Sequence, residues 1–333
     1  MVRDEFVLIK IRSLLFIICH KYSDFIILIL NSAPFLSQIS SFGNFVMLKV
    51  NNMIKILFVA IVALSFVKVD NDFKYKSNYR ESIDTLQVML SKTKVAAEKG
   101  EIYWRISRSY LMLGELSKEK LTKRDYFNKG IENAEKGFEV DPSNPHCYMW
   151  HCANVGRECQ THSLMEQAIS VPIMMTDLQM IIDILDKVDY SPAWQALSEL
   201  YYHHPFKSDD SAINFARKAA LDIPQGELQL STYLYFAKIL LDRDYSQKKR
   251  ASQASSNESK FLKSYDSMID KYSYLDGANL VMPWNGKKVS EVSDHQEAVD
   301  ILKYASSLYE ATSNPSPVDT RDYQEINNMI KTI

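Results

Sequence analysis

Large apolar and small residues recur along residues 100–242 with the spacing of one helical face. In four windows a large residue is followed three positions later by an apolar one, next by a small one, and three positions later by another large one, except that His151 replaces the apolar residue in the second window. These positions share one side of a helix, where a small residue lets a partner helix approach closely. The windows are Tyr103, Ile106, Ser107, Tyr110; Tyr148, His151, Cys152, Val155; Trp194, Leu197, Ser198, Tyr201; and Tyr233, Phe236, Ala237, Leu240.

After two of these windows comes a second predicted helix with small residues along one face. Each of these second helices ends just before a proline. This pattern is typical of tetratricopeptide repeats, pairs of antiparallel helices of about 34 residues that bury their apolar faces by stacking. The spacing here is longer, and the extra length falls at Leu111–Phe127 and Gln160–Thr176, so degenerate repeats are predicted for residues 100–242. The second faces comprise Gly130, Ala134 and Gly137 before Pro142, and Ala212, Ala216 and Ala219 before Pro224.

Composition supports an all-α fold for the remainder of the chain. Only 9 Gly and 10 Pro occur in 333 residues, few for a protein of many strands and tight turns. The predicted class is an all-α, tetratricopeptide-like helical-hairpin solenoid with C-terminal capping helices. A basic lead-in helix is expected in residues 70–99, from Tyr79 to Lys99, and C-terminal helices in residues 261–333, at about Phe261–Leu275, His295–Ala311 and Thr320–Ile330.

Residues 243–260 are expected to form a polar linker between the repeats and the C-terminal helices. This stretch is polar and rich in lysine and serine, a pattern typical of a loop. Its serines form a candidate phosphorylation region. The residues concerned are Lys248, Lys249, Arg250, Ser252, Ser255 and Ser256.

Residues 1–69 form an apolar N-terminal segment unlike the rest. The longest apolar run, Ile56–Val67, has 12 residues, short of the roughly 20 that cross a bilayer. Read from Met53, the run resembles a signal sequence without an obvious cleavage site. Three interpretations stay open: a signal, an anchor giving weak membrane association through residues 54–67, or an extension absent from the mature protein. Secretion is therefore one of the outcomes left open.

Charge is unevenly distributed, although the net charge is only −2. Residues 70–130 carry 13 Lys and Arg against 9 Asp and Glu, whereas residues 131–245 carry 8 against 17. A weakly acidic chain is a poor candidate for coating nucleic acid, so no nucleic-acid partner is expected. A basic segment could meet an acidic protein, although on charge alone such a run is more often a solvated helix face. The candidate partner-binding residues are Lys118, Lys120, Lys123, Arg124 and Lys129.

Catalytic chemistry is weakly represented in the sequence. No P-loop, dinucleotide fingerprint, zinc-protease motif or nucleophile elbow occurs. His203 with His204, and Asp209 with Asp210, are better explained as helix ends than as acid-base pairs. An odd set of core cysteines favours a reducing compartment. We therefore expect no enzyme, no cofactor and no metal, against one weak zinc alternative formed by His146, Cys147, His151, Cys152, Cys159 and His162.

Three segments resemble the regulator of microtubule dynamics proteins, a tetratricopeptide-like animal family. They are GEIYWRISRSYLMLGEL, AEKGFEVDPSNPH and AWQALSELYYHHPFKSDDSAINFARKAALDIP, and the resemblance covers about residues 80–330. It implies binding to tubulin and microtubules, a role at the mitotic spindle in chromosome segregation, and a cytoplasmic, cytoskeletal location. Some relatives carry an N-terminal membrane segment. The family offers no catalytic residues to carry over.

A peptide-binding adaptor of the co-chaperone type is the alternative function. Such adaptors grip an acidic peptide terminus with a lysine and an asparagine of the first repeat. This chain has Trp104 and Arg108 there, which makes the adaptor less favourable than a microtubule-associated scaffold.

Overall fold

The computed structural model describes residues 65–203 and 209–333, without the side chains of residues 164–166. The chain divides into two units, residues 1–67 and 68–333. Of the first unit only residues 65–67 are described. In the second unit the predicted all-α class is confirmed, since the described residues form helices and a single isolated β-bridge between Val281 and Lys288.

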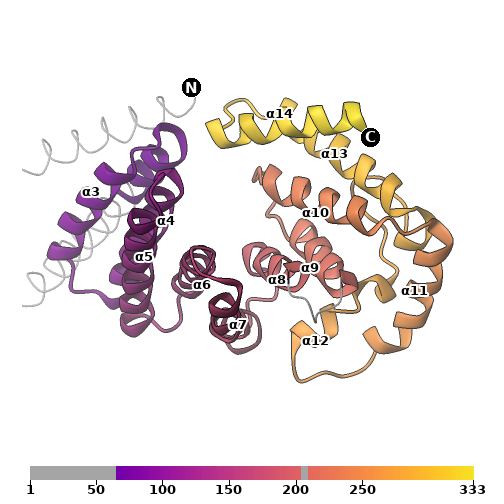
Figure 1. The fold of residues 1–333 in the computed structure, drawn as a ribbon, viewed down its shortest axis with the longest axis horizontal. Coiled ribbons are helices and arrows are strands. Elements are labelled where there is room, and N and C mark those ends of the chain that lie inside the picture. The colour runs from indigo at the N-terminus through magenta and orange to yellow at the C-terminus, as the bar shows by residue number, and fades with distance from the viewer. Residues whose placement is uncertain (1–64, 204–208) are drawn as a thin grey trace, which may run out of the picture. The chain divides into compact units, whose positions relative to one another are not determined.

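Most of the described chain lies in helices joined by short connections (Figure 1). Residues 68–76 are helical and precede α3. The helices are α3 (Tyr79–Lys92), α4 (Ala96–Leu116), α5 (Lys120–Val140), α6 (Pro145–Cys159), α7 (Leu164–Gln179), the π-helix η2 (Met180–Ile184), α8 (Ser191–His203), α9 (Asp209–Leu221), α10 (Leu230–Arg243), α11 (Gln247–Phe261), α12 (Met268–Tyr272), the 3₁₀ helices η3 (Leu275–Ala278) and η4 (Val289–Glu291), α13 (Asp294–Glu310) and α14 (Pro317–Thr332).

Helices α4 and α5 form an antiparallel hairpin held by small residues. A Cβ on Gly114, near the end of α4, would lie 2.3 Å from the ring of Phe127 near the start of α5. At the other end, a Cβ on Gly137 would lie 3.2 Å from Tyr103 and 2.6 Å from the Cys147 sulfur of α6. Glycine is therefore required where α5 meets α4 and α6. The tetratricopeptide-like detail of this pairing stays a prediction.

Two apolar cores succeed one another along the helices. The first lies among α6, α7, η2, α8 and α9, with Trp194 fully buried against Phe215 at 5.7 Å between ring centroids. The second lies among α9, α10, α13 and α14 around Phe236 and Ile301. Because α9 contributes to both cores, nine of its 13 residues are buried. This helix joins the two parts of the scaffold.

The prediction of a polar linker at residues 243–260 was wrong, because Gln247–Phe261 form helix α11. Ser246 caps it by accepting a hydrogen bond from the Lys249 amide. Arg250 points inward and donates to Ser293 O at 2.8 Å and to the Glu297 carboxylate. A buried ion pair thus replaces the apolar stripe that usually holds a helix on its core.

Arg250 belongs to a buried charge cluster that we call the ionic core. Burial opposes ionisation of Glu297, but the charges of Arg217 and Arg250 outweigh it and lower the pKa of this carboxyl. Arg243 donates to both oxygens of Asp294 at 2.8 Å, and its second partner is Asp210, at 2.9 Å. The ionic core therefore ties α9, α10, α11 and α13 together. Its members are Asp210, Arg217, Arg243, Arg250, Asp294 and Glu297.

Several other predicted boundaries differ from the observed ones. Instead of one helix at Phe261–Leu275, α11 ends at Phe261 and only the short α12 and η3 follow. The helix expected at Tyr79–Lys99 is interrupted after Lys92, where Thr93 is extended. The two stretches that exceed the usual repeat length, Leu111–Phe127 and Gln160–Thr176, are mostly helical. The first lies in α4 and α5, which are each 21 residues long, and the second is largely occupied by α7 (Leu164–Gln179). The last two predicted helices coincide with α13 and α14.

Candidate functional site

The predicted basic segment forms the start of α5 and the residues just before it. Lys118 and Glu119 lie in the connection after α4, and Lys120 is the first residue of α5. The segment lies in the stretch of extra length Leu111–Phe127, and this stretch is part of the hairpin itself, because α4 runs to Leu116 and α5 continues unbroken from Lys120 to Val140. The cations therefore lie on and beside a rigid helix at one end of the α4–α5 hairpin.

Two of the predicted cations are engaged within the protein. Arg124 Nε lies 3.5 Å from Glu158 Oε1 and 3.2 Å from the hydroxyl of Thr161, which link α5 to the end of α6. Lys129 donates to Asp125 at 2.7 Å one turn earlier on α5. That hydrogen bond raises the pKa of Lys129, so it stays charged. Arg124 acts chiefly inside the scaffold, while Lys129 is half exposed.

The other three lysines have no carboxylate within 4.0 Å among the described residues. Lys118 and Lys120 are exposed and Lys123 is half-buried. Two large apolar side chains flank them, Leu116 with 67% and Leu121 with 75% of its surface exposed. This end of the hairpin thus presents uncompensated positive charge beside apolar surface, a combination suited to an acidic protein partner.

Arg80 extends the positive charge onto α3. It is exposed and donates to the hydroxyl of Tyr126 on α5, and the Tyr126 ring also lies 5.7 Å from the Lys129 ammonium. Sequence reasoning missed this arginine, because its contact spans 46 residues; the basic composition of residues 70–99 was the only signal. We call Arg80, Lys118, Lys120, Lys123 and Lys129 the basic end.

The residues predicted to hold the repeats lie inside the scaffold. Ser107 accepts a hydrogen bond from the Asn154 amide at 3.0 Å, which links α4 to α6. Ser198 donates to Ala212 O at 2.7 Å between α8 and α9. Half-buried positions are Tyr103, Tyr110 and Tyr201; buried positions are Ser107, Cys152, Trp194, Ser198, Ala212, Ala216, Ala219 and Ala237.

Trp104 and Arg108 occupy the positions that would bind a peptide in the adaptor alternative, and both side chains are engaged in contacts within the protein. Trp104 is buried and stacks on His146 with ring centroids 4.9 Å apart. Arg108 lies 3.7 Å above the ring of Phe73 and donates to Asp70 at 2.6 Å. Arg108 therefore holds residues 68–76 against α4, while Trp104 packs α4 against α6. An acidic peptide terminus would have to displace Asp70 to reach Arg108.

The cysteines and histidines considered for zinc are dispersed over several contacts. His146 contacts the hydroxyl of Tyr190 at 2.8 Å, whereas His151 contacts Asp177 at 2.7 Å. In residues 65–203 and 209–333, no group of three or more His, Cys, Asp or Glu side chains could hold a metal ion. The zinc alternative therefore has no assembled site in this part of the chain.

The core cysteines are poorly suited to nucleophilic catalysis. Burial raises the pKa of the Cys147 thiol to about 12 and raises that of Cys152 well above its ordinary value. Burial also raises the pKa of Cys159. Since the thiolate is the reactive form, these side chains behave as small packing residues at neutral pH.

The remaining candidate pairs are two histidines and two aspartates, and their described members lie at helix ends. His203 is the last residue of α8, while His204 and Pro205 lie outside the described residues. Asp209 and Asp210 open α9, where carboxylates complement the helix dipole. Of residues 54–67, only 65–67 are described. Nowhere in the described chain is a helix both long and apolar enough to span a membrane.

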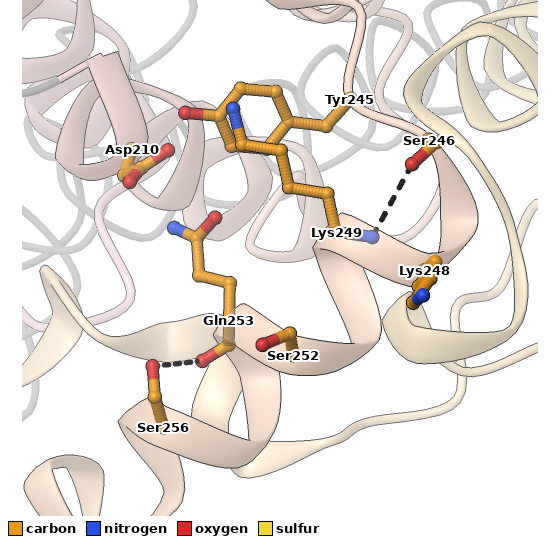
Figure 2. Close-up of a pocket in the computed structure, with 8 residues that line it drawn as sticks. All are labelled: Asp210, Tyr245, Ser246, Lys248, Lys249, Ser252, Gln253 and Ser256. Atoms are coloured by element: carbon orange, nitrogen blue, oxygen red, sulfur yellow. Dashed lines mark hydrogen bonds between the residues drawn. The ribbon is translucent and has the colours of Figure 1, made fainter.

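An open hollow lies between α11 and the start of α9 (Figure 2). Lysine and serine side chains of α11 line it, with Tyr245 and Asp210 on the opposite side. The Lys249 ammonium lies 3.3 Å from the centroid of the Tyr245 ring. The hollow is open to solvent and is lined mostly by residues with polar or charged groups, unlike an enclosed site for a small apolar ligand.

Comparison with known proteins identifies relatives of the N-terminal part. Residues 67–171 match the family model described as Regulator of microtubule dynamics protein 1-3. Regulator of microtubule dynamics protein 2 of Mus musculus is 22% identical over 110 residues, which cover 33% of this chain and 27% of that protein. Regulator of microtubule dynamics protein 3 of Bos taurus is 31% identical over 71 residues, covering 21% and 15%. The chain thus spans less than a third of either relative.

Proposed function

Because residues 67–171 relate this chain to the regulator of microtubule dynamics proteins, we propose that it binds microtubules and regulates their dynamics. It does so as a helical scaffold, through protein contacts and without catalysis of its own. A cytoskeletal and spindle location, with a role in chromosome segregation, extends the same proposal.

The observation that carries this proposal is the basic end. Its five cations all lie within the matched residues 67–171, and three of its lysines have no carboxylate partner among the described residues. An acidic surface such as that of tubulin attracts this end over about 8 Å at physiological salt. The rigid hairpin keeps the cations together, so several weak ionic contacts act at once.

The exposed leucines beside the lysines supply a second kind of contact. Leu116 and Leu121 can be covered by a partner, and burying such a side chain contributes about 1.5–3 kcal/mol before the costs of association. Binding is therefore expected to weaken strongly with added salt while keeping a salt-resistant remainder.

Co-pelleting with microtubules tests the role of the basic end. We expect that changing Lys118, Lys120 and Lys123 together to Glu removes most of the binding at physiological salt. Arg124 is left intact, since its contacts with Glu158 and Thr161 serve the scaffold. The melting transition should stay close to that of the unmodified chain, because none of the three lysines has an ion pair to lose within the described residues.

A matched variant controls for net charge. Changing Lys263, Lys303 and Lys331 to Glu alters the total charge equally, but these exposed lysines lie on or near the C-terminal helices. Binding should persist in this control. If both triple variants pellet like the unmodified chain, the basic end is a solvated face and the proposed contact is wrong.

A further inference from the structure

Helix α11 displays serines on its outer face and buries an arginine on its inner face. Ser252, Ser255 and Ser256 are exposed, whereas Arg250 has 1% of its surface accessible. Ser252 and Ser256 line the hollow with Lys248 and Lys249 (Figure 2). This helix therefore combines an accessible serine with a run of three cations that ends two positions before it in sequence.

Ser252 is distinguished from the other serines by the residues that precede it. Lys249 and Arg250 stand three and two positions before it, and no acidic residue intervenes. Ser255 and Ser256 are preceded at these positions by uncharged residues, and Ser246 has Asp244 two positions before it. Protein kinases select substrates partly by such charge patterns, using carboxylates that pair with the cations before the acceptor.

We propose that Ser252 is phosphorylated by a kinase that recognises basic residues, and that α11 must open locally to be modified. The hydroxyl oxygen of Ser252 attacks the γ-phosphorus of ATP, and a new oxygen–phosphorus bond forms. The bond from that phosphorus to the oxygen bridging to the β-phosphate breaks, ADP leaves, and the hydroxyl proton passes to the kinase's catalytic base.

Opening is needed because the recognition arginine is engaged inside the protein. In the closed helix Arg250 donates to Ser293 O and to Glu297, and its Nε lies 3.3 Å from Asp294. A kinase cannot pair with this guanidinium until those contacts break. The ionic core thus controls access to the serine from the other side of the helix.

Local opening is favoured by the composition of α11. Its buried residues are Arg250, Ala254 and Asn257, so the helix has little apolar surface on the core. Elements with few buried apolar contacts open at lower free energy than the global unfolding transition. α11 can therefore expose its sequence while the two apolar cores remain intact.

The modified helix can also close again. Lys248 and Lys249 stand four and three positions before Ser252, on the same helix face, and all three residues line the hollow. A phosphate carrying about −1.5 to −2 charges at neutral pH would lie beside these two ammonium groups. Phosphorylation consequently changes the hollow from basic to acidic, next to the carboxylate of Asp210.

The test uses the full chain, ATP and the catalytic subunit of cyclic-AMP-dependent protein kinase as probe. Mass spectrometry of the digested product locates the phosphate. We expect it on Ser252; Ser252→Ala should abolish it, and Ser255→Ala should leave the rate unchanged. Glu297→Gln weakens the closed state without altering the recognition sequence, so the initial rate should rise by about tenfold or more.

A second variant that weakens the packing of α11 keeps the test possible if Glu297→Gln does not fold. Asn257→Ala removes the hydrogen bond to Asp276 at 3.0 Å, at the other end of α11 and outside the recognition sequence. It should also accelerate modification while the protein still melts cooperatively. The proposal is overturned if no phosphate appears on Ser252, or if folded loosened variants react no faster than the unmodified chain.

Discussion

The start of α5 and the start of α11 carry similar runs of cations, but only the run in α11 places one of its cations, Arg250, in the buried interior. Around Lys120 and Lys123 the charges face solvent, and three of the lysines have no carboxylate partner among the described residues. In α11, Arg250 turns inward to Glu297 and Asp294, and all three side chains are buried. We propose the first run as a surface for partners, whereas in the second Arg250 holds α11 to α13.

The depth at which a charge lies determines what it contributes to stability. An exposed ion pair contributes little to stability, because water and salt screen it. A buried pair is costly to desolvate, yet removing one partner leaves an uncompensated charge in the interior. Stability should therefore depend on the ionic core, whereas binding should depend on the basic end.

The largest expected effect comes from breaking the ionic core. Glu297→Ala leaves Arg217 and Arg250 buried without their shared carboxylate, and should lower the free energy of unfolding by about 3–5 kcal/mol. Urea unfolding measures the loss. In the matched control, Glu325→Ala removes the exposed pair with Lys238 and should cost less than about 1 kcal/mol. Equal losses would contradict the contrast between buried and exposed charges.

A smaller effect is expected from overpacking the contacts between helices. Ala219 is fully buried in α9, so Ala219→Leu should cost about 1–3 kcal/mol in thermal or urea unfolding. Ser307→Leu adds a side chain of the same size on the exposed face of α13, and should change stability little. An unchanged midpoint for Ala219→Leu would mean that α9 does not pack as described.

The smallest effect should appear in the pH dependence of the α4–α6 contact. Burial lowers the pKa of His146; Glu101 opposes this and Arg105 reinforces it. The unfolded chain therefore takes up a proton at higher pH than the folded one, and stability should fall as pH drops below the ordinary histidine pKa of 6.5.

Melting temperatures at pH 7.5 and 5.5 measure this dependence in the unmodified chain and in His146→Gln. The unmodified chain should lose more stability on acidification than the variant, which has no imidazole at this position. A variant with an undiminished pH dependence would show that other groups titrate in this window.

Local periodicity predicted the helical scaffold where the signals lie close together in sequence. The small residues of α4, α8 and α9 recur at helical spacing, so their burial follows from the pattern around Ser107, Ser198 and Ala219. Helix α7 was obscured because Pro172 falls in its interior, a position where proline usually interrupts a helix.

Contacts between distant residues could not be inferred from local patterns. Arg250 meets Glu297, 47 positions away, so a helix stabilised by this contact looks like a polar loop in sequence. The charge of the basic end could be predicted from composition. The engagement of Arg124 by Glu158 and the contribution of Arg80 through Tyr126 required the fold.

The three buried cysteine thiols of α6 can serve as built-in probes of local opening in this scaffold. Cys147, Cys152 and Cys159 react with a thiol reagent only when their surroundings open, because burial both shields them and suppresses the thiolate. With Cys19 replaced by Ser, the chain retains only these three cysteines. Their modification rates would then report how often α6 separates from its neighbours, without any added label.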